Sequence, residues 1–158
     1  MAKALVIYHS KSGHTRKMAE SVSEGISGTG VSVTLTEVAK AKVDDLKGAD
    51  AVVLGSPCYY GCMAGELKSF LDESVSLHGK LEGKIGGAFA SSGMLGGGNE
   101  TTVLSMVCAL MIHGMTVPGN SKIGHYGPVA IGEPDEKALK ECHAYGRKIG
   151  EITKRLTG

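Results

Sequence analysis

The sequence lacks features that mark several common classes of protein. It has no tryptophan, only five tyrosines and two phenylalanines, and no apolar run near the roughly 20 residues that span a bilayer. Lysine and arginine total 17 against 16 acidic residues, so the formal net charge of +1 favours neither nucleic acid nor an anionic membrane as a partner. Residues 1–3 lead into a strand-like segment rather than a signal peptide, so we expect a cytoplasmic protein.

Metal-binding and nucleotide-binding signatures are also missing. The four cysteines form no CxxC pair and have no histidine cluster beside them to complete a zinc site; they are Cys58, Cys62, Cys108 and Cys142. We therefore expect no metal, and thiols that are reduced and mostly buried. Neither GxxxxGK[ST] nor GxGxxG occurs, which argues against a P-loop and against a dinucleotide-binding turn.

Five strands are predicted from the hydrophobic pattern. Residues 4–8 and 51–55 are continuous apolar runs, typical of strands buried on both faces of a parallel sheet. Residues 31–35 alternate, which indicates an edge strand with one face partly wet. A fourth strand is predicted at 85–90 and a short fifth strand at 115–117.

Helical patterns separate these strands. After a first amphipathic helix, a second is predicted at about 64–75, and a third begins near the capping residue Asn99. The last helix is predicted to have Pro134 at its first helical position. The alternation of strand and helix predicts one α/β domain over residues 1–158, with a parallel sheet and helices on both faces.

Three unusual loops follow the first, third and fourth strands, at the sheet edge where such folds bind ligands. Residues 10–15 place hydroxyls and a glycine at the start of a helix, which suits a phosphate, although a plain capped turn is the alternative. Residues 56–63 contain Tyr59 and Tyr60, which could lie against a planar ring or cap the core. Residues 91–98 end in three glycines, which suit close approach to a flat heterocycle or a mobile linker.

Taken in order, these loops resemble those of a known group of proteins. The pattern Ser10-x-Ser12-Gly13-x-Thr15 resembles the phosphate loop of flavodoxins, which bind FMN. The segments 55–72 and 91–100 and the pair Gly114-Met115 are similar to WrbA-type NAD(P)H:quinone oxidoreductases. The resemblance implies a flavodoxin-like three-layer α/β sandwich, a sheet order of 2-1-3-4-5 and FMN as the cofactor.

The resemblance also assigns residues to the cofactor. The FMN phosphate would lie against Ser10, Lys11, Ser12, Gly13, His14 and Thr15. One side of the isoalloxazine ring would meet Pro57, Cys58, Tyr59, Tyr60 and Gly61. Its other edges would meet Ser91, Ser92, Gly93, Met94, Leu95, Gly96 and Gly97. No catalytic side chain is then required, because the flavin carries the chemistry.

The sequence departs from the WrbA-type pattern around the substrate. It is shorter between the second and third strands. His78 stands where the WrbA-type pattern has a tryptophan. That pattern also has two histidines before the Gly-Met pair, of which this sequence keeps His113 alone. The resemblance places His78 and His113 in the substrate pocket and implies self-association, with neighbouring subunits completing that pocket.

Two redox interpretations follow. The near-neutral charge favours a reductase of quinones or similar small acceptors, with NADH or NADPH as donor. The altered pocket residues favour a flavodoxin-type carrier that passes single electrons between redox proteins.

A third interpretation is a non-flavin binding or signalling module. A phosphate-accepting receiver would need acidic residues where His9 and Ser10 stand and an aspartate where Gly55 and Ser56 stand, which argues against it.

Overall fold

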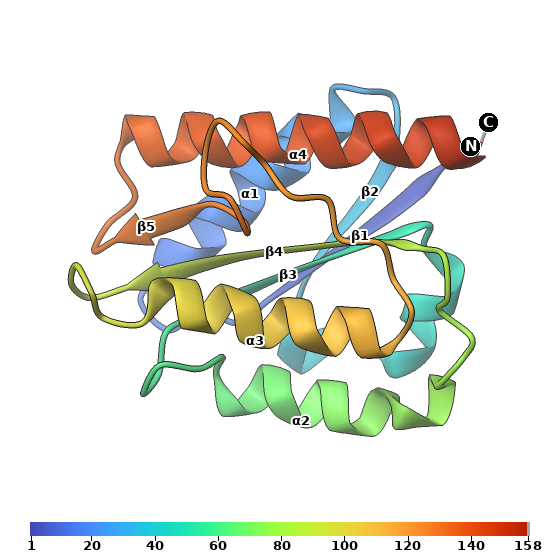
Figure 1. Cartoon of the computed structure of the whole chain (residues 1–158), viewed down its shortest axis with the longest axis horizontal. Helices are drawn as coiled ribbons and strands as arrows, with labels where there is room; N and C mark the ends of the chain where they lie inside the picture. The colour runs from blue at the N-terminus through green and yellow to red at the C-terminus, as the bar shows by residue number, and fades with distance from the viewer. Residues whose placement is uncertain (158) are drawn as a thin grey trace.

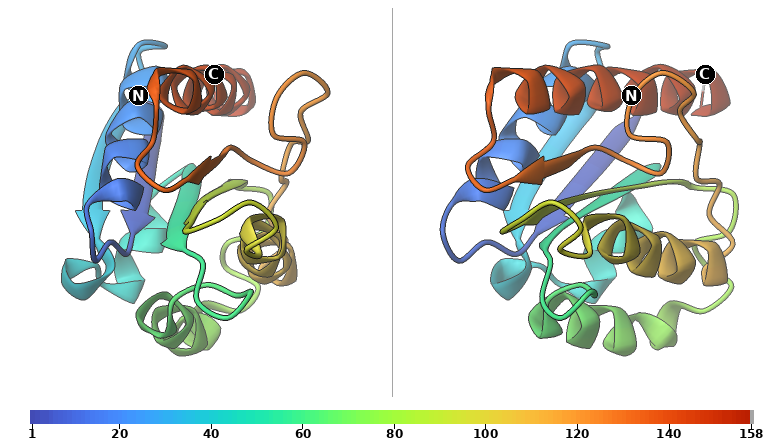
Figure 2. Two further views of the ribbon diagram at one scale, coloured as in Figure 1. Left: turned by 90° about the vertical axis from the view of Figure 1, so that its left-hand side faces the viewer. Right: turned by 60° about the vertical axis from the view of Figure 1, so that its left-hand side comes forward.

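The computed structural model describes residues 1–157 as three layers built around a parallel sheet (Figure 1). The five strands lie in the order β2-β1-β3-β4-β5, which confirms the predicted order. Their bounds are β1 (Lys3–Tyr8), β2 (Ser32–Glu37), β3 (Ala51–Pro57), β4 (Ile85–Ser92) and β5 (Val129–Ile131). One face is covered by α1 (His14–Ser27) and α4 (Glu136–Thr157), and the other by α2 (Gly65–Glu73) and α3 (Asn99–Ile112) (Figure 2).

The central strands supply both cores because their side chains alternate between the layers. In β1, Leu5 and Ile7 pack with α2 and α3, whereas Val6 packs with α1 and α4. Strands β3 and β4 are buried almost throughout, as their continuous apolar runs predict. The edge strand β2 is partly exposed along its length, also as predicted.

Helices α1 and α4 cross at close range because glycines line their contact. A Cβ atom built on Gly146 would lie 2.0 Å from the carbonyl oxygen of Val22. A Cβ atom on Gly25 would lie 2.1 Å from the carbonyl oxygen of His143. Backbone therefore meets backbone in this contact, and the crossing fixes the direction of α1, whose first turn borders the loop after β1.

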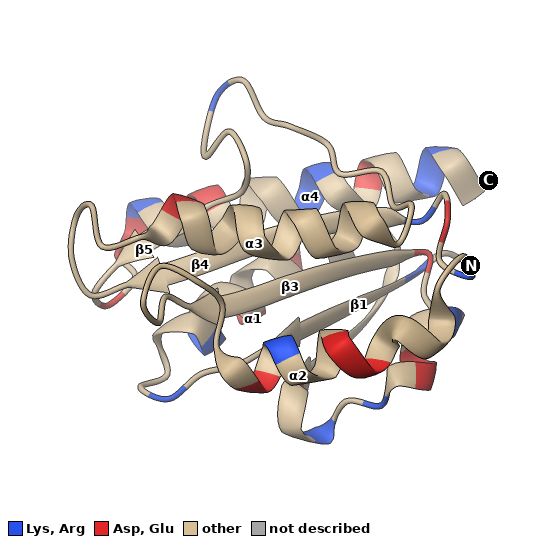
Figure 3. Cartoon of the chain, turned by 60° about the horizontal axis from the view of Figure 1, so that its bottom comes forward, with Lys and Arg blue, Asp and Glu red and all other residues tan. Residues whose placement is uncertain are grey.

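Helix α3 is apolar on nearly all sides. Glu100 is its one charged residue, so the helix is almost free of charge in Figure 3. The outward side chains of Met111 and Ile112 are 61% and 72% exposed. Helices that are apolar all round are normally buried, so this outer face suits contact with another surface.

The fifth strand was predicted in the wrong place. The segment 115–117 reaches the sheet at Thr116, which forms an isolated bridge with Ile85 at the start of β4. The chain then leaves the sheet and returns as β5 beside the end of β4. His125 and Tyr126, which follow 115–117, therefore precede the fifth strand. A short apolar triplet indicates a contact with the sheet but not the length of that contact.

On the side of β4 that faces β5, a side chain replaces strand pairing at Ala88. The Ala88 amide donates a hydrogen bond of 3.0 Å to the hydroxyl of Tyr145. Burial raises the pKa of this phenol to about 12. Gly87 makes room for it, because a Cβ atom there would lie 2.8 Å from the Tyr145 oxygen. The phenol thus satisfies an amide that a longer fifth strand would otherwise bind.

We expect Tyr145→Phe to lower the free energy of unfolding by about 1–3 kcal/mol, because the buried Ala88 amide loses its acceptor. Urea unfolding measures the effect. Tyr126→Phe, at a half-exposed phenol, is the matched control and should change stability by less than about 0.5 kcal/mol. Equal stabilities for Tyr145→Phe and the parent would contradict the role given to this hydroxyl.

The helices begin and end close to the predicted residues, with three differences. Helix α3 is capped by Gly98, at φ 96°, and Asn99 is its first residue rather than its cap. Helix α4 begins at Glu136, since Asp135 Oδ1 accepts a 2.8 Å bond from the Ala138 amide and Pro134 lies outside the helix. The predicted helix at 64–75 divides into α2 and the 3-10 turn η3 (Ser74–Leu77).

Burial tests the prediction made for the thiols. All four cysteines are free, but Cys142 alone is buried, whereas Cys58 is half-buried and Cys62 and Cys108 are exposed. The prediction of mostly buried thiols is therefore wrong, because three of the four positions lie on a loop or on an outer helix face.

Within residues 1–157, no helix combines the length and apolarity that a bilayer crossing requires.

Candidate functional site

The loops after β1, β3 and β4 meet at the carboxyl edge of the sheet (Figures 1 and 2). Thr15 Oγ1 lies 2.9 Å from Ser91 Oγ, which joins the first loop to the third. The Cys58 amide donates to the Ser91 carbonyl oxygen at 2.7 Å, and its thiol donates to the Gly97 carbonyl oxygen at 3.0 Å. These contacts bring the three predicted segments into one place.

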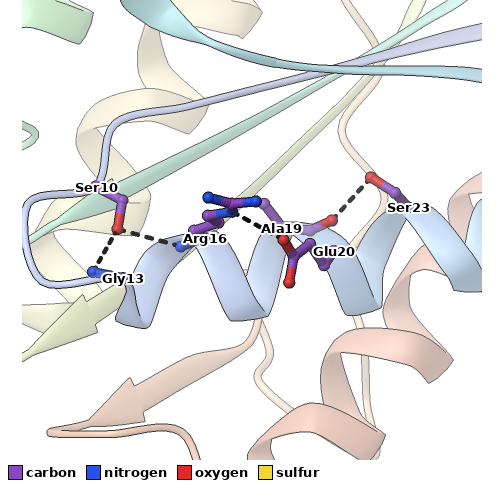
Figure 4. A network of polar contacts seen from close by, with 6 residues as sticks. All are labelled: Ser10, Gly13, Arg16, Ala19, Glu20 and Ser23. Atoms are coloured by element: carbon purple, nitrogen blue, oxygen red, sulfur yellow. Dashed lines mark hydrogen bonds and ion pairs between the residues drawn. The ribbon is translucent and has the colours of Figure 1, made fainter.

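The first loop presents free donors at the start of α1. Ser10 Oγ accepts bonds from the amides of Gly13 at 3.1 Å and Arg16 at 3.3 Å, which closes the loop (Figure 4). The first amides of a helix have no partner within the helix. In the described part of the chain, no hydrogen bond occupies the amides of Ser12, His14 and Thr15. With the positive end of the helix dipole, they form a site suited to a dianion.

Basic side chains on α1 are paired with carboxylates. Arg16 Nε binds Glu20 Oε1 at 2.9 Å (Figure 4), and Lys17 pairs with Glu133, which follows β5. The hydrogen bond from Lys17 holds the pKa of the Glu133 carboxyl below its usual range. Lys11, on the loop itself, forms no ion pair among residues 1–157. An anion at this loop would therefore be held chiefly by amides, hydroxyls and the helix dipole, with Lys11 nearby.

The second loop is a tight hairpin that exposes an aromatic ring. Tyr59 and Cys62 exchange backbone hydrogen bonds of 3.0 and 3.1 Å. Between them, Tyr60 has φ 50° and Gly61 has φ 76°. Two successive positive φ angles mark a type I′ turn, where Asn-Gly is the preferred pair, so a tyrosine at the first position is strained. The Tyr60 side chain is fully exposed and that of Tyr59 is 38% exposed.

The third loop carries apolar side chains on a glycine frame. Met94 and Leu95 are 66% and 82% exposed. A Cβ atom on Gly98 would lie 2.8 Å from the Gly61 Cα and 2.9 Å from the Cys58 Sγ, so glycine lets the third loop lie against the second. The Ser92 hydroxyl and the Gly97 amide both donate to the Met94 carbonyl oxygen. These internal bonds argue against a mobile linker.

Together the loops suit a ligand with a phosphate at one end and a flat ring at the other. The free amides lie on the first loop, and the exposed apolar side chains lie on the second and third loops; the latter are Tyr59, Tyr60, Met94 and Leu95. A flat ring would cover apolar surface that the described chain leaves open. The residues present therefore fit a flavin mononucleotide.

His78 and His113 are not brought to these loops within one chain. His113 follows α3, whose 14 residues carry the chain about 20 Å from the glycine loop toward the start of β4. There the Gly83 amide binds the Gly114 carbonyl oxygen at 3.0 Å. A single copy of the chain therefore does not form the predicted pocket, because α2 and α3 both run away from the site.

His113 has an internal role at that distant end. Its Nε2 lies 2.7 Å from Ser74 Oγ, and its Nδ1 is buried without a partner among residues 1–157. Burial lowers the pKa of His113, and the neighbouring His78 lowers it further. Both effects favour the neutral form of the imidazole, which packs the end of α3 against η3.

Sequence reasoning missed two residues that adjoin the site. His9 directly precedes the first loop, and its ring contacts that of Tyr59. Its place just after a buried strand was a signal that could have identified it. Glu133 pairs with Lys17 from 116 positions away, and no local pattern indicates such a partner.

Comparison with known proteins gives consistent results. Residues 5–101 match the family described as "Flavodoxin domain". The chain is 41% identical, over 96% of its length, to a protein from Aquifex aeolicus named "Flavodoxin", of which it covers 86%. It is 30% identical to an "NAD(P)H dehydrogenase (quinone)" from Archaeoglobus fulgidus, over 99% of this chain and 100% of that one. The structure of the "flavodoxin, WrbA-like protein from Agrobacterium tumefaciens" matches with a TM-score of 0.84 at 29% identity, covering 98% of this chain and 99% of that one.

Proposed function

This chain belongs to the flavodoxin family, and we propose on that basis that it binds FMN at the three loops and exchanges electrons through it. One observation carries the proposal: the free amides of Ser12, His14 and Thr15 and the exposed rings of Tyr59 and Tyr60 belong to loops that are hydrogen-bonded together at one sheet edge. Flavodoxin-type proteins bind FMN, and the site offers what its two ends require.

The chain's own residues bind and orient the cofactor. Bound FMN would supply the electron transfer. The amides and hydroxyls of residues 10–15 would hold the phosphate, with the helix dipole adding to the attraction. The second and third loops would lie at the sides of the ring, and the Cys58 bonds to Ser91 and Gly97 would keep those loops at a fixed separation.

The first candidate for the reaction is reduction of quinones or similar small acceptors by NADH or NADPH. The near-neutral charge gives little attraction to a strongly charged protein partner, which favours a small acceptor. The relative from Archaeoglobus fulgidus is named for this reaction, and this chain matches it over its full length. In this interpretation His78 and His113 would need a second copy of the chain to approach the FMN.

The outer face of α3 would suit that second copy. It presents Leu104, Cys108, Met111 and Ile112 to solvent or partly so. The face is almost free of charge, so two copies could meet there without like-charge repulsion (Figure 3). Self-association through this face is therefore part of the reductase proposal.

The second candidate is a flavodoxin-type electron carrier. The observation that favours it is the distance of His78 and His113 from the loops, since a single chain then has no built pocket for a nicotinamide or quinone. The relative from Aquifex aeolicus named "Flavodoxin" also shares more identity with this chain than the quinone dehydrogenase does.

One set of measurements tests the proposal. The purified protein, mixed with FMN and freed of excess, should retain flavin absorption, and a colourless product would overturn FMN binding. The loaded protein is then assayed for oxidation of NADH and NADPH with benzoquinone, beside gel filtration for its oligomeric state. Turnover by an oligomer supports the reductase. The carrier is supported if the protein is a monomer that oxidises neither nucleotide but passes electrons from reduced flavin to cytochrome c.

A further inference from the structure

His9 occupies a place in the site that the proposed function has not yet used. It follows β1 directly, and its amide donates a 3.0 Å bond to the Gly55 carbonyl oxygen on the neighbouring strand β3. Its ring centroid lies 6.2 Å from that of Tyr59, with the two planes at 73°. This is the edge-to-face arrangement that aromatic pairs prefer.

Tyr59 depends on such a contact for a fixed ring orientation. The hairpin bonds to Cys62 fix its backbone, but its ring is 38% exposed. Among residues 1–157, Tyr59 makes one aromatic contact, which is with His9. Tyr60, at the tip of the turn, makes none within the same residues. Of the two tyrosines, Tyr59 is therefore the one whose ring is held.

His9 lies beside Glu66, in the first turn of α2. His9 Nε2 lies 3.8 Å from Glu66 Oε2, a distance that allows an ion pair when the imidazole is protonated. The His9 side chain is 17% exposed and that of Glu66 is 59% exposed. Glu66 also lies where the dipole of α2 favours a negative charge. The imidazole thus joins the end of β1, the second loop and the start of α2.

We propose that His9 is a positioning residue for FMN, which holds the Tyr59 ring at the angle at which that ring meets the flavin. The inference rests on the proposed binding of FMN at these loops. His9 acts through Tyr59, so its effect on FMN disappears when the Tyr59 ring is removed.

A double-mutant cycle on FMN affinity tests this. His9→Ala weakens FMN binding by roughly 2- to 13-fold, the range that one aromatic pair contributes. In a Tyr59→Ala background, His9→Ala has no further effect, because the ring on which it acts is gone. His9→Phe keeps the ring contact and restores affinity. His143→Ala, at an exposed histidine of α4, leaves affinity unchanged.

The FMN-free protein provides a second measurement. Its NMR spectrum should show nuclear Overhauser contacts between the ring protons of His9 and those of Tyr59. In His9→Phe, the ring of the introduced phenylalanine should show the same contacts with Tyr59. If FMN binds the parent but the two alanine substitutions have additive effects, or His9→Phe fails to restore affinity, the inference is overturned and FMN binding stands. A parent protein that binds no FMN overturns both.

Discussion

Ser12→Asp should lower FMN affinity by up to roughly a thousandfold. The new carboxylate would lie beside the free amides at the start of α1, where the dianionic phosphate is proposed to bind. Like charges about 4 Å apart repel by about 1 kcal/mol in water and about 4 kcal/mol near a protein surface. Because each 1.4 kcal/mol is a factor of ten, FMN affinity should therefore fall by about fivefold to roughly a thousandfold. Titration of the FMN-free protein, followed by quenching of flavin fluorescence, measures it.

Two further variants separate charge from folding in this test. Ser12→Ala keeps the backbone amides and adds no charge, so it should retain most of the affinity. Ser76→Asp adds the same charge at an exposed position of η3, at the far end of α2, and should bind FMN like the parent. Equal FMN affinity for Ser12→Asp and the parent would show that the phosphate does not lie on this loop.

Gly146→Ala should destabilise the fold by about 2 kcal/mol. The added methyl group would lie 2.0 Å from the Val22 carbonyl oxygen, and a backbone atom cannot move aside as a flexible side chain can. Overpacking of this kind costs about 1–3 kcal/mol and sometimes more. It outweighs the gain of up to about 1 kcal/mol that alanine brings over glycine within a helix. Urea unfolding of the FMN-free protein measures the change.

Gly65→Ala is the matched control for that substitution. Gly65 is also helical, but a Cβ atom there meets nothing within 4 Å. Its replacement should leave stability unchanged or raise it slightly. Similar unfolding midpoints for Gly146→Ala and Gly65→Ala would show that α1 and α4 can separate at little cost, contrary to the close crossing described above.

The sheet was largely predictable because buried strands and covering helices have distinct apolar periods. Continuous runs such as residues 4–8 and 51–55 require helices on both faces, and the alternation of elements then limits the topology. The fifth strand was misplaced because its pairing is divided between Thr116 and residues 129–131. Nothing local indicates that Tyr145 supplies the acceptor between these two contacts.

The loops of the site were predictable for a similar reason, since each follows a recognisable strand. Their mutual contacts were not, because Thr15 and Ser91 or Cys58 and Gly97 are distant in sequence. His78 and His113 were assigned to the pocket from their likeness to a pattern, whereas the directions of α2 and α3 decide where they lie. His9 was overlooked because its role depends on a ring from another loop.

The brevity of β5 affects how this protein behaves when concentrated. A long outer strand is a template on which foreign chains can add and begin to aggregate. Here the outer strand has three residues, and the backbone of Gly127 lies so near the Ala88 carbonyl oxygen that a Cβ atom would be 2.0 Å from it. An incoming chain would find few backbone groups to bind along this side, so this edge of the sheet is a poor template for strand addition.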